Sequence, residues 1–277
     1  MTADTTSVAA GYTVPRRFGA VAPAVIAGVV LLALWELGVR AFGIREFVLP
    51  RPSSIGQALV DNWSTSEGVS TVSLRQAGWN TTVIAVSGLV VGVSLGVALA
   101  LLASRYVRVG RTLTPFAVAA NATPIVALAP IFNAWFGITS ALSNQAVVVV
   151  VVFFPVFLNT ARGLLEVEPS QIELMRSYGA SDLSVLRQVR IPNAIPFFLT
   201  SLRLAAPLSV IAAIVAEYFG GPQDRLGPVI TQNASFARYA EAWAAIVVAS
   251  VVGLALFALA VGFERVAMPW RRPVDGQ

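Results

Sequence analysis

The chain has 277 residues, a net charge of +5 and a mean hydropathy of +0.75, with 56% apolar and only 12% charged residues. Soluble domains carry about one-quarter charged residues, so this composition indicates an integral membrane protein. All 19 basic residues are arginine, and lysine, histidine and cysteine are absent; this excludes His- or Cys-based nucleophiles, His- or thiolate-ligated metals, disulfides and a lysine-containing ATP-binding loop.

Six apolar runs divide the chain. Each can cross about 30 Å of hydrocarbon at about 1.5 Å per residue. We expect an all-α, polytopic membrane protein with a disordered cytoplasmic tail over residues 1–17, a transmembrane domain over 18–265 and a cytoplasmic tail over 266–277. The predicted spans cover about residues 18–42, 79–103, 113–136, 141–159, 194–219 and 242–263.

The first run contains one acidic residue, Glu36, near its far end. We expect this carboxylate to snorkel to the membrane surface. Between the first and second runs, residues 55–63 have apolar side chains at helical spacing, which predicts a short interfacial or docking helix.

The second run carries Gly88, Gly92 and Gly96 at intervals of four residues. Small residues at this spacing let two membrane helices approach closely. We interpret these glycines as a packing face.

The third run is interrupted by Pro115, Pro124 and Pro130. Proline frees a backbone carbonyl, and a membrane tolerates this only where protein or water satisfies the freed group. We therefore expect the third run to line the working interior.

Arginines fix the expected orientation. With the N-terminus inside, the inner segments carry twelve arginines and the outer segments six. This bias places both termini in the cytoplasm. It also accounts for the basic residues through membrane topology, so we expect no nucleic-acid partner.

A charged segment, residues 166–192, separates the fourth and fifth runs. Ser170 to Glu173 matches the S-x-x-E capping box, and Gly179 stands where a left-handed C-terminal cap is needed. A second helix is predicted from Ser181 to Pro192. Each helix is about 13 Å long, too short to cross a membrane. Two interpretations are equally weighted on these residues: a rigid contact for a soluble partner, or an amphipathic hairpin lying on lipid.

The same segment resembles a known motif. Residues 173–179 (ELMRSYG), followed by 189–192 (VRIP), are similar to the EAA motif (E-A-A-x-x-x-G, nine residues, I-x-L-P) of ABC importer permeases. Leu174 and Met175 replace the two alanines. The resemblance covers about residues 20–265 and points to the nitrate, sulfonate and taurine branch through further matches at ALAP (127–130), WFG (135–137), FFP (153–155), NT (159–160) and VAE (215–217).

The resemblance implies a type I importer permease with the MetI-like fold and cytoplasmic coupling helices, located in the bacterial cell membrane. Its expected partners are a cytoplasmic ATPase dimer, a second permease subunit forming a homodimer, an extracytoplasmic solute-binding protein and membrane lipid. ATP and Mg²⁺ would bind the ATPase subunits, so this chain needs no cofactor, metal or catalytic residue. The implied ATPase-coupling residues are Glu173, Arg176, Gly179, Ala180 and Pro192. Glu173 has an equally weighted role as the capping-box acid.

Polar groups in the third to fifth runs are candidates for the translocation pathway, because uncompensated polar groups inside a membrane are costly. Arg203 is expected to snorkel to the cytoplasmic surface instead. The candidate pathway residues are Asn121, Thr123, Asn133, Asn159, Ser209 and Glu217.

Two other functions stay open on the sequence. A self-contained secondary transporter or channel would favour paired buried acids across internal repeats, and neither is evident. A membrane enzyme would have only acid, Ser or Tyr chemistry. Within the importer hypothesis the expected substrate is a small organic solute, either sulfonate-, taurine- or nitrate-like or a thiamine-precursor-like pyrimidine.

Overall fold

The computed structural model describes residues 17–65, 72–105 and 124–268, and these residues form helices without any strand. The all-α prediction is therefore confirmed for this part of the chain. Five of its helical stretches are long and apolar enough to cross a membrane. They are α1 (Arg17–Ala41), α3 (Leu74–Arg105), α6 (Ala141–Leu165), the continuous stretch Asp182–Phe219 that ends in α9 (Ile191–Phe219), and α11 (Tyr239–Ala267).

The predicted third span is described only in its second half. Residues 106–123, which include the first 11 residues of that run and its Pro115, lie outside the described residues, as do most of both predicted tails. The described part is α5 (Ile125–Phe136), a helix of 12 residues with Pro130 inside it. A helix of this length does not cross a bilayer alone.

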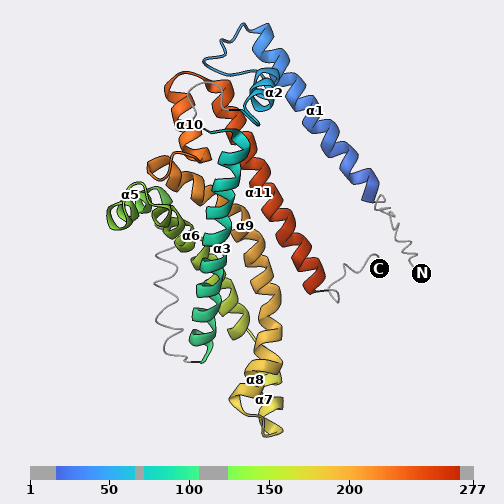
Figure 1. Cartoon of the computed structure of the whole chain (residues 1–277). Helices are drawn as coiled ribbons and strands as arrows, with labels where there is room; N and C mark the ends of the chain where they lie inside the picture. The colour runs from blue at the N-terminus through green and yellow to red at the C-terminus, as the bar shows by residue number, and fades with distance from the viewer. Residues whose placement is uncertain (1–16, 66–71, 106–123, 269–277) are drawn as a thin grey trace, which may run out of the picture.

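The long helices form an elongated bundle with different structures at its two ends (Figure 1). α3, α6 and α9 pack on one another, and α11 packs on α9. The short helices α7 (Pro169–Ser177) and α8 (Asp182–Val185) lie at one end, and α2 (Pro52–Asp61) and α10 (Leu226–Ser235) lie at the other. The bundle therefore presents one compact helical tip at the α7 end.

The predicted glycine face is the contact between α3 and α6. A Cβ atom on Gly88 would lie 2.5 Å from Val148 Cγ1, and one on Gly92 would lie 2.9 Å from the Val149 carbonyl oxygen. Both distances are shorter than van der Waals contact. The glycines thus let the valine-rich face of α6 pack directly against the α3 backbone, which confirms their interpretation as a packing face.

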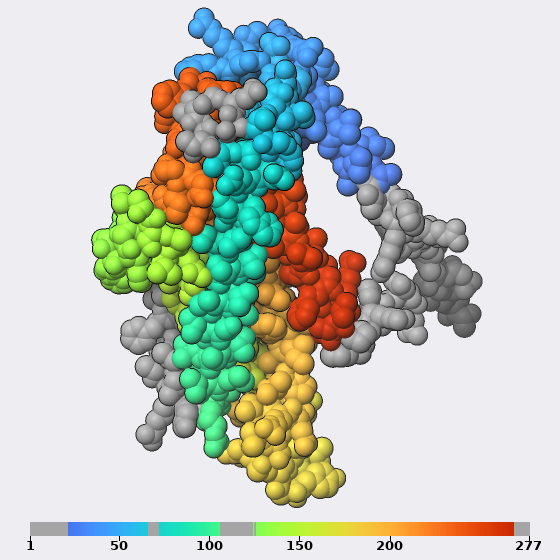
Figure 2. All heavy atoms as spheres, viewed as in Figure 1, coloured from blue at the N-terminus to red at the C-terminus, as the bar shows by residue number. Residues whose placement is uncertain are grey.

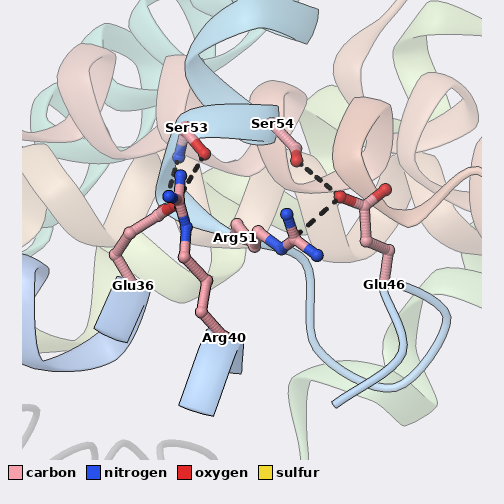
Figure 3. A network of polar contacts seen from close by, with 6 residues as sticks. All are labelled: Glu36, Arg40, Glu46, Arg51, Ser53 and Ser54. Atoms are coloured by element: carbon pink, nitrogen blue, oxygen red, sulfur yellow. Dashed lines mark hydrogen bonds and ion pairs between the residues drawn. The ribbon is translucent and has the colours of Figure 1, made fainter. Parts of the chain in front are cut away.

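α1 projects away from the bundle and leaves most of its apolar side chains exposed (Figure 2). The Glu36 carboxylate holds the junction between α1 and α2 (Figure 3). It accepts hydrogen bonds from the Ser53 backbone N–H at 3.1 Å and the Ser53 hydroxyl at 2.9 Å, and Arg40 lies 2.6 Å away. Since α2 begins at Pro52 with no cap from its own side chains, Glu36 supplies an acceptor for a free N–H of its first turn.

α2 confirms the short helix predicted between the first two spans. Its buried residues Ile55 and Ala58 pack in a cluster with Ala245 and Val248 of α11 and Leu226 of α10. These contacts close the end of the bundle opposite α7.

Candidate functional site

α7 has no buried side chain. It begins two residues earlier than the capping box predicts, at Pro169, and its N-cap residue Glu168 makes no side-chain capping bond. The predicted capping box from Ser170 to Glu173 is therefore wrong, because proline is favoured at the first helical position and brings Ser170 inside the first turn. Glu173 is exposed, and its carboxylate has no hydrogen bond or ion pair within the described part of the chain.

The other end of α7 is closed by the predicted glycine cap. Gly179 has φ +71°, in the left-handed region. The Gly179 N–H donates to Arg176 O at 2.9 Å, and the Ala180 N–H donates to Met175 O at 3.0 Å. This pair of bonds is the Schellman motif, which satisfies the last carbonyls of a helix. The sequence prediction of a left-handed cap at Gly179 is confirmed.

The predicted second short helix is not separate. α8 starts at Asp182 with Ser181 as its N-cap, and it continues through the π-turn η1 (Leu186–Arg190) directly into α9. Pro192 was expected to end this helix, but it occupies the first turn of α9 instead. The wider π-turn just before it accommodates a residue that lacks an N–H, as π-bulges inside helices do.

Three polar contacts fix the base of α7 and α8 to the bundle. Arg105 at the end of α3 lies 3.2 Å from Asp182, and Arg190 donates to Ser104 O at 2.9 Å. Asn193 donates to two carbonyls near the end of α6, Gly163 O at 2.8 Å and Glu166 O at 3.1 Å. The tip is therefore joined to α3, α6 and α9 by hydrogen bonds as well as by the chain.

At the opposite end, Glu217 is almost fully buried near the end of α9. Its Oε2 atom accepts hydrogen bonds from the Thr81 hydroxyl of α3 at 3.0 Å and from the Gly227 N–H of α10 at 3.1 Å. Thr81 in turn accepts from the Leu226 N–H at 3.1 Å. Glu217 therefore links three helices and does not project freely into a pathway.

Asn133 of α5 belongs to a second buried network beside the end of α9. It donates to Phe219 O at 3.1 Å and accepts from the Ser143 hydroxyl of α6. Asn144, also on α6, is fully buried, and neither side-chain polar atom has a partner among the described residues. Of the predicted pathway residues, the structure thus places Asn133 and Glu217 at the same end of the bundle.

The other predicted polar residues are arranged differently. Asn159 and Ser209 bond to carbonyls of their own helices, Pro155 O at 2.8 Å and Ala206 O at 2.7 Å. Asn121 and Thr123 lie outside the described residues.

Arg203 makes a contact that the sequence did not suggest. Its guanidinium lies 3.6 Å from the Glu264 carboxylate of α11. This ion pair joins α9 to α11, and the snorkelling of Arg203 to the cytoplasmic surface stays a prediction.

Several partners were missed because the sequence analysis considered polar groups only in the third to fifth runs. Thr81 lies in the second run and Glu264 just beyond the predicted end of the sixth. The contacts of Arg190 and Asn193 with backbone carbonyls could not be predicted, because every residue carries a carbonyl group. Within the described ranges, no group of three or more Asp or Glu residues is placed to hold a metal ion.

Comparisons with known proteins agree with this architecture. Residues 92–272 match the family described as "Binding-protein-dependent transport system inner membrane component". The chain is 34% identical over 242 residues to the "Formylaminopyrimidine transport permease protein ThiX" of Halalkalibacterium halodurans, covering 87% of this chain and 93% of the relative. It is 26% identical over 249 residues to the "Putative aliphatic sulfonates transport permease protein SsuC" of Bacillus subtilis, covering 89% and 87%.

A solved structure supports the fold. The crystal structure of an amino acid ABC transporter with histidines superposes with a TM-score of 0.55 at 17% identity, over 77% of this chain and 95% of that chain. At this identity the similarity concerns the fold alone.

Proposed function

The chain belongs to the family of binding-protein-dependent transport system inner membrane components, as an ABC importer permease of the nitrate, sulfonate and taurine branch, and from this premise we propose that it carries a small organic solute into the cell. It is a multi-pass membrane protein. We place both of its termini in the cytoplasm, because of the arginine bias.

The observation that carries the proposal is the exposed α7 tip. A helix with no buried side chain and a free carboxylate at Glu173 is available for a partner. Pro169 at the first helical position and the left-handed cap at Gly179 fix the two ends of α7, and α8 continues into α9 without a break. A push on such a tip moves the spans as rigid bodies, whereas a floppy loop would absorb it.

The energy must come from another subunit. With no lysine, the chain has no P-loop of the GxxxxGK[ST] kind. We assign ATP and Mg²⁺ to a cytoplasmic ATPase dimer that docks on α7, with Glu173, Arg176, Gly179, Ala180 and Pro192 as the coupling residues. Two copies of this chain would form the pathway, and an extracytoplasmic binding protein would deliver the solute.

The polar networks of Asn133 and Glu217 lie at the end of the bundle opposite α7, on the outer side in this orientation. They support a role in shaping the outer mouth of the pathway, although each side chain also holds helices together. Among substrates to test, formylaminopyrimidine comes first, because the chain is 34% identical to a relative named for it and 26% identical to one named for sulfonates.

Reconstitution tests the proposal. The chain would be placed in proteoliposomes with its ATPase and binding protein, and uptake of labelled formylaminopyrimidine, taurine and an alkanesulfonate would be measured. We expect uptake of one of these solutes only when ATP, the ATPase and the binding protein are all present. Uptake by the chain alone, driven by an ion gradient, would establish a secondary transporter and overturn the proposal.

A further inference from the structure

A basic cavity of about 180 Å³ lies at the α7 end of the bundle, where α3, α7 and α8 meet. Three arginines and one aspartate give its wall a net charge of +2. The lining residues are Ser104, Arg105, Ile172, Arg176, Asp182, Val185, Leu186 and Arg190.

The positive charges of the cavity are only partly neutralised within the chain. Arg105 pairs with Asp182 at 3.2 Å, whereas Arg190 bonds to a neutral carbonyl, Ser104 O. The guanidinium group of Arg176 has no ion pair or hydrogen bond with any described residue. Arginine side chains arranged in this way favour a phosphate group, which accepts several N–H bonds at once.

A separate apolar groove of about 190 Å³ lies between α3, α6 and α9. It is lined by Val97, Leu101, Thr160, Leu164, Ile191, Ala194, Ile195 and Phe198. Leu101 precedes Arg105 by four residues on α3, and Arg190 precedes Ala194 by four residues on the other side. Residues four apart share one face of a helix, so groove and cavity form one strip along the same two elements.

We infer that this strip binds an anionic phospholipid, with its phosphate among Arg105, Arg176 and Arg190 and an acyl chain along the groove. Basic pockets between membrane helices select acidic headgroups over zwitterionic ones. The inference does not depend on the identity of the transported solute.

The inference gives Arg176 a second role. The family resemblance assigns this residue to the contact with the ATPase, but its side chain lines the lipid cavity at the base of α7. A bound phosphate there would hold α7 against α3 and α8.

Lipid retention by the purified full-length chain tests the inference. Native mass spectrometry would be recorded in mild detergent with phosphatidylglycerol, phosphatidylcholine or inorganic phosphate. We expect phosphatidylglycerol to be retained about five-fold or more over phosphatidylcholine, since each arginine near an anionic headgroup contributes about this factor. Equal retention of the two lipids would overturn the inference, and displacement by millimolar inorganic phosphate would show a simple phosphate site instead.

Variants locate the lipid. Arg176→Gln should lower phosphatidylglycerol retention about five-fold. Arg187→Gln is the matched control, because this arginine is exposed on the same segment and does not line the cavity. An equal loss in Arg187→Gln would refute the site. So would an Arg176→Gln variant that keeps the lipid and loses only ATPase binding, because the arginine would then serve a protein carboxylate.

Discussion

The contact between Gly88 of α3 and Val148 of α6 gives a sharp test of how the bundle is held together. In Gly88→Ala, the new Cβ would lie 2.5 Å from Val148 Cγ1 and 2.6 Å from Val148 Cβ. Val148 is fully buried and valine has no flexible end that could move aside, so the helices must separate. Overpacking of this kind costs about 1–3 kcal/mol.

The net effect is smaller, because replacing glycine by alanine also restricts the unfolded chain. That term stabilises by about 0.4–1 kcal/mol. We therefore expect Gly88→Ala to lower the free energy of unfolding by roughly 0.5–2 kcal/mol. Gly262→Ala on α11 is the matched control: nothing lies within 4 Å of its new Cβ, so it should be neutral or slightly stabilising.

A double-mutant cycle separates this clash from other effects. Unfolding in mixed detergent and SDS micelles, followed by circular dichroism, would be measured for Gly88→Ala, Val148→Gly and the double variant, because only glycine at position 148 removes both clashing atoms. The double variant should be more stable than the sum of the single changes predicts, by about 1 kcal/mol. Additive effects, or a Gly88→Ala variant as stable as Gly262→Ala, would refute close packing at this position.

Two further predictions use the same unfolding assay. Thr81→Val removes a hydroxyl that donates to the buried Glu217 carboxylate and should lower the free energy of unfolding by about 1–3 kcal/mol. Thr82→Val is the control, because the Thr82 hydroxyl bonds within its own helix, and it should cost less than half as much. Equal losses of stability in the two variants would contradict the network. Ser140→Ala removes the hydroxyl that accepts from the first turn of α6 and should lower the free energy of unfolding by about 1 kcal/mol. Ser94→Ala is the control, because the Ser94 hydroxyl bonds to a carbonyl of its own helix. Equal stabilities of the two variants would show that the cap is not needed.

Local chemistry determined which parts of the coupling segment could be predicted from the sequence. Gly179 was predictable, because the left-handed cap depends on a few neighbouring residues. The start of α7 was misplaced because Pro169 and Ser170 each favour a helix start, and the proline prevailed. The continuity of α8 with α9 could not be predicted, since Pro192 normally signals a helix end and a π-turn has no sequence signature.

The polar networks at the other end needed tertiary structure. Thr81 and Glu217 are separated by 136 residues, and Asn133 meets Phe219 O across 86 residues. Sequence spacing indicates which residues share a helix face, but not which faces of distant helices meet. The polar candidates were therefore identifiable as unusual in a membrane, while their partners were not.

The glycine face shows the opposite case. Gly88, Gly92 and Gly96 lie four residues apart on one helix, so their shared face follows from helical geometry alone. Only the identity of the opposite surface, the valine-rich face of α6, required the structure.

The most direct test of the account is the activity of α7 variants in the reconstituted importer. Glu173→Ala and Gly179→Pro should leave the chain inserted in the membrane but abolish solute transport and the ATP hydrolysis that loaded binding protein stimulates. Glu168→Ala removes an exposed acid with no capping bond, and Gly179→Asn keeps a residue that tolerates the left-handed region, so both controls should retain most of the activity. Full transport in Glu173→Ala and Gly179→Pro would contradict the proposal that the α7 tip couples ATP hydrolysis to transport.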